Sequence, residues 1–179
     1  AIARQSGPAV EKACAPYQFA LSTRGGTDCV GHAIRVLTDM DPSLQVLSVD
    51  GIGAYDFMFR QTMLSKQQRT PVARDALPFT RLSYDHASEY LWENDDGSTA
   101  AISQAEGREQ GDPLMPLLFC LGIHDALDHV ASQLLPGEIV FAYLDDVYAV
   151  CQPEQAEAVY ELLGTVLARE CGIRLHDAK

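Results

Sequence analysis

The sequence predicts an α+β fold in which a small antiparallel sheet packs against apolar helices. Residues 46–50 and 141–150 are apolar stretches of strand-like composition, and each carries aspartates where a turn is expected. Longer segments that begin at Asp112 and Pro153 have apolar residues at helical spacing over a broad face. A sheet and helices with apolar faces of this kind bury those faces against each other.

Composition indicates one domain. The chain has 179 residues, of which 47% are hydrophobic, and this is enough for a substantial core. No apolar run approaches the length of about 18 residues that a membrane-spanning helix needs, so we expect no membrane contact. The five cysteines are scattered without a C-x-x-C pair, which favours reduced thiols in an intracellular protein. We interpret residues 1–179 as a fragment of one domain in a longer protein.

The net charge of −12 restricts the choice of partner. Taken alone, this charge argues against nucleic acid, because phosphate contacts come from lysine and arginine. A nucleic-acid partner remains compatible with it if the acids gather at a metal site and on the outer surface. The basic surfaces would then belong to other parts of the longer protein.

The first part of the chain is expected to place one helix between two strands. Residues 1–16 lack clear periodicity and are expected to be coil, with a helical turn near 10–15. The expected elements after them are a strand at 17–21, a turn at 22–27, a helix from Thr27 or Asp28 to the residue before Asp41, a strand at 46–50 and a helix at 57–68.

The second part is expected to contain two hairpins and two long helices. Pro71 and Pro78 limit any helix between residues 70 and 85 to one or two turns. The expected elements after them are a hairpin of 87–93 and 98–104 around Asn94-Asp95-Asp96-Gly97, a helix from Asp112 to about Leu135, the acidic hairpin 141–150, a helix from Pro153 that ends at Gly172, and a strand at 173–176.

The aspartates at the two apolar stretches are the candidate functional residues. Asp50 and Asp145 are 95 residues apart, so a meeting between them is tertiary. Two carboxylates about 4 Å apart repel by roughly 4 kcal/mol at an effective dielectric constant near 20, so their convergence needs a cation or a shared proton. Carboxylate oxygens suit Mg²⁺, and a pair of such ions is the common arrangement for displacement at phosphorus.

Four motifs in order resemble a known family. They are residues 48–56 (Ser-Val-Asp-Gly-Ile-Gly-Ala-Tyr-Asp), residues 110–119 (Gln-Gly-Asp-Pro-Leu-Met-Pro-Leu-Leu-Phe), residues 143–146 (Tyr-Leu-Asp-Asp) and residues 172–179, which end in a lysine. Over residues 18–179 the chain resembles the fingers–palm core of a reverse transcriptase, and it is most similar to those of non-LTR (LINE-type) retrotransposons. The resemblance implies a polymerase palm with part of the fingers and without the thumb.

The resemblance also implies an activity, which is RNA-templated DNA synthesis. Asp50 and Asp145 would hold two Mg²⁺ ions, with Mn²⁺ as a substitute, and Asp146 would assist. One ion would activate the primer 3′-hydroxyl and the other would bind the incoming triphosphate. The implied partners are an RNA template, a DNA primer and dNTP, and an endonuclease domain in the complete retrotransposon polyprotein. The isolated fragment is expected to be inactive.

Five further residues receive roles from the resemblance. Tyr55 would lie beneath the nucleotide sugar and leave no room for a 2′-hydroxyl. Gln110 and Gly111 would contact a template or nucleotide phosphate at the start of a helix. Arg24 lies where the fingers of the family carry basic residues that grip phosphates. Lys179 would neutralise or protonate the pyrophosphate leaving group.

The sequence departs from the family at two positions, and other interpretations stay open. Met115 stands where the family usually has serine, and His176 where it usually has asparagine. One alternative is an RNA-directed RNA polymerase, against which Tyr55 and the Gln110-Gly111 loop argue. A second is a catalytically inactive palm remnant that serves as a scaffold. A third is a small Ca²⁺- or Mg²⁺-binding protein, but no D-x-D-x-D-G loop is present.

Overall fold

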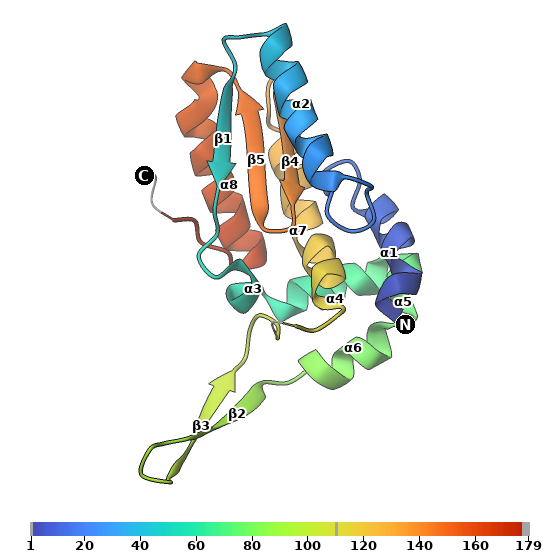
Figure 1. The fold of residues 1–179 in the computed structure, drawn as a ribbon, viewed down its shortest axis with the longest axis vertical. Helices are drawn as coiled ribbons and strands as arrows, with labels where there is room; N and C mark the ends of the chain where they lie inside the picture. Colours follow the sequence, from blue (N-terminus) through green and yellow to red (C-terminus); the bar gives the residue numbers. More distant parts are fainter. Residues whose placement is uncertain (1, 110, 177–179) are drawn as a thin grey trace.

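The computed structural model describes residues 2–109 and 111–176. A three-stranded antiparallel sheet lies at its centre, with strands β1 (Gln45–Val49), β5 (Asp146–Cys151) and β4 (Ile139–Tyr143) in that order across the sheet (Figure 1). Helices pack on both faces, so the predicted α+β class is confirmed. The expected acidic hairpin is also confirmed, as β4 and β5.

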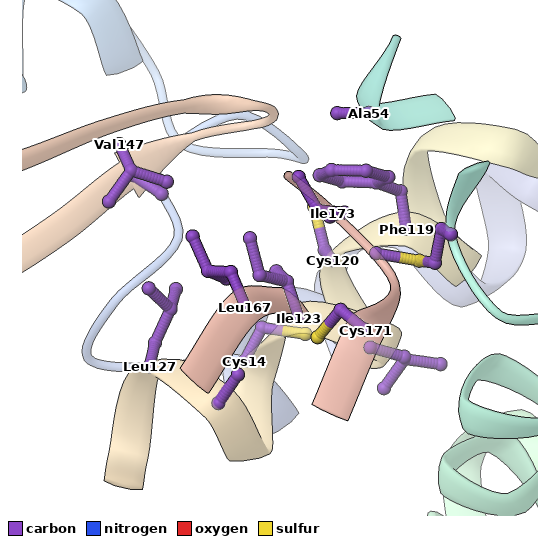
Figure 2. Packing of buried hydrophobic residues seen from close by; sticks show 14 of the residues in the cluster. Cys14, Ala54, Phe119, Cys120, Ile123, Leu127, Val147, Leu167, Cys171 and Ile173 are labelled. Atoms are coloured by element: carbon purple, nitrogen blue, oxygen red, sulfur yellow. The ribbon is translucent and has the colours of Figure 1, made fainter. Parts of the chain in front are cut away.

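The two faces of the sheet follow from the alternation of side chains along β4 and β5. Val140, Ala142, Val147 and Ala149 belong to a large core with α7 (Met115–Ala131) and α8 (Ala156–Cys171). In Figure 2, side chains of α7 and α8 converge with Val147 of β5 in this core. On the opposite face, α2 (Gly26–Met40) packs against the aromatic and branched side chains of β4 and β5, namely Phe141, Tyr143, Tyr148 and Val150.

Helices α7 and α8 form the larger core with one face of the sheet. Helix α8 follows a short 3-10 turn, η1 (Pro153–Gln155), and its C-cap is Gly172 in the left-handed conformation at φ 78°, as expected. Helix α7 begins at Met115 rather than Asp112 and ends at Ala131 rather than near Leu135. The late start has a local cause, because the Asp112 carboxylate accepts the Leu114 amide at 2.8 Å in a turn that precedes the helix.

A second group of elements lies beyond one end of the sheet. It contains the short helices α3 (Ala54–Phe57), α4 (Arg60–Arg69), α5 (Pro71–Arg74) and α6 (Leu77–Tyr84), and the hairpin of β2 (Ser88–Glu93) and β3 (Thr99–Gln104), which projects away from the body (Figure 1). The expected hairpin and the one- or two-turn helices are confirmed. The single helix expected at 57–68 is interrupted, because the Phe59 amide donates to the Cys171 carbonyl and the Met58 carbonyl accepts the Gly107 amide.

The N-terminal segment differs from the expectation of coil. Residues Ile2–Ala13 form helix α1, which buries Val10 and packs on α7 and α5. Gly7 and Pro8 both lie inside this helix, so local propensity opposes it and burial of its apolar face outweighs that propensity.

The two expected outer strands form only single bridges. Gln18 makes a parallel bridge to Ala142 at the edge of β4, and Leu175 makes an antiparallel bridge to Gly51. All five cysteines are free thiols, and four of them are buried. Among the described residues, no helix has the length and apolar character needed to cross a membrane.

Candidate active site

Three aspartates meet at one end of the sheet. Val49, the last residue of β1, pairs with Val147 of β5, and the same register brings the next residue, Asp50, level with Asp146. Asp145 lies in the two-residue turn between Tyr143 and Asp146, which are themselves paired. The antiparallel order β1-β5-β4 therefore joins acids that are far apart in sequence. The Asp50 side chain is 75% exposed, so this end of the sheet is open to a ligand.

The turn that carries Asp145 has an unusual backbone. Leu144 adopts a φ of 56°, and it is the only residue other than glycine with a positive φ in the described part of the chain. Two-residue turns between antiparallel strands use such conformations because they match the twist of the strands. The Gln18 side chain bonds both the amide and the carbonyl of Leu144, at 3.0 and 2.9 Å.

The charges of Asp145 and Asp50 act on Asp146. Partial burial raises the pKa of Asp146, and the negative charges of Asp145 and Asp50 raise it further. Within residues 2–109 and 111–176, no three His, Cys, Asp or Glu side chains are grouped so as to hold a metal ion by themselves. Mg²⁺ is usually bound by one or two carboxylates together with water and substrate phosphates, so a Mg²⁺ site does not require three protein ligands.

Tyr55, on α3, contacts this acidic group. Its hydroxyl donates a hydrogen bond to Asp145 Oδ1 at 3.1 Å, and its ring centre lies 4.5 Å from that of Phe119 on α7. Burial, together with the charge of Asp145, raises the pKa of Tyr55 well above its usual range. The hydroxyl therefore stays protonated and acts as a donor to the carboxylate at any ordinary pH.

Two other residues predicted for the site, Arg24 and Gly111, lie in loops that precede helices. The exposed Arg24 precedes α2, and the start of α2 lies against Tyr143, where a Cβ on Gly26 would come within 3.1 Å of the Tyr143 ring. Gly111 is exposed, with a φ of 96°, in the loop before α7. Gln110 and Lys179 lie outside the described residues. His176, which stands in place of the usual asparagine, has Nε2 3.7 Å from Asp50 Oδ2.

A buried network that the sequence did not indicate holds the loop before α7. Arg108 is 2% exposed, with its guanidinium 3.5 Å from the centre of the Tyr84 ring and 3.1 Å from Asp112 Oδ2. Tyr84 donates to the same carboxylate oxygen at 2.5 Å. Burial alone would raise the pKa of Asp112, but the hydrogen bonds from Tyr84, the Leu114 amide and Arg108 outweigh it and lower that pKa.

The same loop is joined to the element that carries Tyr55. The Arg108 amide donates to the Tyr55 carbonyl at 3.0 Å, and Arg60 Nε donates to the Gly107 carbonyl at 2.9 Å. Both arginines are buried, and each contacts a partner that is distant in sequence, so no local pattern distinguishes them from surface residues. Gln18 was missed because its hydrogen-bond partner in the β4–β5 turn is also distant in sequence.

The architecture and the position of the acids define an α+β, reverse-transcriptase-like fold. Among the solved structures with a similar architecture are telomerases. Telomerase from Candida tropicalis truncated from its C-terminal domain superimposes with a TM-score of 0.69 at 11% identity, over 98% of this chain and 38% of that chain. Apo telomerase from the same organism gives a TM-score of 0.71 at 10% identity, over 98% and 34%.

A further similar structure was determined with RNA. Telomerase from Candida albicans in complex with the TWJ fragment of telomeric RNA gives a TM-score of 0.64 at 12% identity, over 98% of this chain and 33% of that chain. The chain thus spans about a third of the length of these telomerase chains. No protein-family model and no curated protein matches the sequence. At these identities the similarity establishes the fold.

Proposed function

We propose that this chain is the palm and part of the fingers of an RNA-directed DNA polymerase of the non-LTR retrotransposon type. The reaction would transfer a nucleotide from a dNTP to the 3′-hydroxyl of a DNA primer paired with an RNA template. One observation carries the proposal: the β1–β5 register brings Asp50 level with Asp146, beside the turn that holds Asp145. The reverse-transcriptase-like fold supports it.

The acids are suited to binding two Mg²⁺ ions together with substrate. Asp50 and Asp145 would be the ligands, and Asp146 would add negative charge beside them. Bound ions would lower the pKa of the primer hydroxyl and neutralise charge on the triphosphate. Tyr55 would restrict the orientation of Asp145 through its hydroxyl, and the contact with Phe119 supports the Tyr55 ring.

An open surface beside the acids would receive the primer end. On β1, Val46 and Ser48 are exposed on the face of the sheet that α2 packs against, and Asp50 follows them at the end of the strand. Helix α2 contacts β4, at the other edge of the sheet. The face near β1 is therefore free for a ligand that reaches the acids.

The test is single-nucleotide incorporation by the complete polymerase that contains this chain. We expect Asp50→Asn and Asp145→Asn each to reduce incorporation by at least about a thousandfold, because each removes a charged ligand. Asp96→Asn is the matched control, since Asp96 is an exposed acid in the β2–β3 turn and the charge change is the same. Incorporation by Asp50→Asn or Asp145→Asn within about tenfold of wild type would contradict the proposal.

A further inference from the structure

The turn between β4 and β5 is held from outside the hairpin. Leu144 has a φ of 56°, a region that residues with a side chain rarely adopt. Glycine, asparagine or aspartate usually occupies such a position, and leucine has no local means of stabilising it. The paired strands favour this turn, and because leucine adds no stabilisation of its own, contacts from outside the hairpin can contribute to holding it.

Gln18 contacts the turn from outside the hairpin through hydrogen bonds to the Leu144 backbone. Its side chain is buried, with the residue 4% exposed, and its Nε2 donates to the Leu144 carbonyl at 2.9 Å. Its Oε1 accepts the Leu144 amide at 3.0 Å. One amide thus satisfies both backbone groups of the strained residue. These two groups belong to the peptide units before and after Leu144, so the pair of hydrogen bonds restrains both of them.

The backbone around Gln18 explains why the side chain reaches the turn. The Phe19 amide donates to the Ala142 carbonyl at 3.1 Å, and the Ala142 amide donates to the Tyr17 carbonyl at 2.7 Å. Gln18 is therefore bound to the edge of β4 two residues before Leu144. Its side-chain amide continues this pairing beyond Ala142, in the place where a backbone amide of a longer strand would lie.

We propose that Gln18 is a positioning residue that holds the Leu144–Asp145 turn and thereby orients Asp145 and Asp146. The consequence for metal binding rests on the proposed function, whereas the effect on the turn does not. Like charges on the two neighbouring acids favour their separation, so a turn without an external contact would relax. Relaxation of Leu144 toward negative φ would rotate Asp145 away from the Tyr55 hydroxyl, which donates to it at 3.1 Å.

The first measurement is hydrogen exchange of the Leu144 amide by NMR, in the intact chain. Gln18→Met keeps the volume of the side chain and removes both hydrogen bonds, so we expect protection of this amide to fall by at least about tenfold. Gln67→Met is the matched control, because Gln67 is 2% exposed and its amide bonds Ala73 and Thr80, away from the turn. It should leave Leu144 exchange unchanged. Gln18→Asn keeps the amide but shortens its reach, and it should behave as Gln18→Met does.

The second measurement is Mn²⁺ affinity by electron paramagnetic resonance, with a rescue. We expect Gln18→Met to weaken Mn²⁺ binding by at least about fivefold, and Leu144→Gly in that background to restore most of the loss, because glycine adopts positive φ freely. A residue that only stabilised the core would show no such rescue, since Leu144→Gly removes further packing.

The outcomes separate the two proposals. Unchanged Leu144 exchange in both Gln18 variants, or absence of rescue by Leu144→Gly, would overturn the role of Gln18. Absence of Mn²⁺ binding by the wild-type chain, or binding that Asp145→Asn leaves unaltered, would instead count against the proposed function. In that case the exchange of Leu144 still decides whether Gln18 holds the turn.

Discussion

Tyr55 combines two contacts that belong to different parts of the proposed reaction. Its hydroxyl bonds Asp145, and its ring lies against Phe119. The ring is the part that would exclude a 2′-hydroxyl, and the hydroxyl is the part that would orient a metal ligand. Substitutions that remove one part at a time can therefore separate sugar selection from the rate of the reaction.

Tyr55→Val is expected to reduce discrimination against ribonucleotides by at least about tenfold, which is about 1.4 kcal/mol in relative transition-state energy. The physical reason is that valine leaves space where the ring stood, while Asp50 and Asp145 remain. Incorporation of dNTP should fall modestly, because the hydrogen bond to Asp145 is also lost. The measurement is single-nucleotide incorporation with both sugars by the complete polymerase.

Tyr55→Phe is the matched control, since it keeps the ring and removes only the hydroxyl. It should lower incorporation of both sugars to a similar degree and leave their ratio unchanged. If Tyr55→Val does not alter the ratio, then Tyr55 is a core aromatic and the preference for DNA synthesis over RNA synthesis loses its structural support.

The loop before α7 is fixed to α3 by close backbone contact. Gly107 has a φ of 68°, and a Cβ placed on it would lie 2.1 Å from the Asp56 carbonyl oxygen. Its amide donates to the Met58 carbonyl at 2.9 Å. Only glycine permits this approach, so the position of α3, and of Tyr55 on it, depends on Gly107.

Gly107→Ala is expected to lower the free energy of unfolding by at least about 3 kcal/mol, from the positive φ and the steric clash together. Gly97→Ala is the control, because Gly97 has a φ of 77° but a Cβ added to it would meet nothing within 4 Å. Gly97→Ala should lower the free energy of unfolding by only about 1 kcal/mol, from backbone strain. Urea unfolding of the two variants gives the difference, and equal losses would show that the loop moves aside at little cost.

Elements with a strong local signal were predictable from sequence, and those that depend on tertiary contact were not. The β2–β3 hairpin follows from Asn94-Asp95-Asp96-Gly97, and the end of α8 follows from Gly172, since both signals act through the backbone of the residues themselves. Helix α1 and the break between α3 and α4 were missed. Their causes are burial against α7 and backbone bonds to Gly107 and Cys171, none of which is local.

The same division holds for the candidate site. Asp50, Asp145 and Tyr55 could be chosen from short motifs, and the structure places Tyr55 in contact with Asp145 and brings Asp50 level with Asp146. Gln18 and Arg108 could not be chosen, because a glutamine or arginine acquires such a role only through residues distant in sequence. Short motifs thus identified residues that gather at the sheet end, but not the residues that hold them in place.

Charge is a property of the whole molecule, and it opposes binding of nucleic acid by this chain alone. The net charge is −12, although residues 60–84 contain five lysines or arginines and one aspartate. We expect the isolated chain to bind a primer–template duplex with a Kd weaker than about 10 μM at physiological salt. Fluorescence anisotropy over a salt series measures this.

Arg74→Glu tests where the remaining attraction lies, because Arg74 is exposed within the basic segment 60–84. Arg74→Glu should weaken the residual duplex binding. Arg24→Glu should weaken that binding to a similar degree only if the turn before α2 also contacts phosphate. Tight binding that falls steeply with salt would show that local basic surfaces outweigh the net charge.

The order of the strands along the chain affects which of them can pair during synthesis on the ribosome. The central strand, β5, is the last of the three strands along the chain, and its two partners, β1 and β4, both precede it. Ribosomes add about 5–20 residues per second, so β1 is synthesised roughly 5 to 20 seconds before its partner β5. A nascent chain that has not reached Asp146 therefore carries β1 without its native neighbour and Asp50 without the acids beside it.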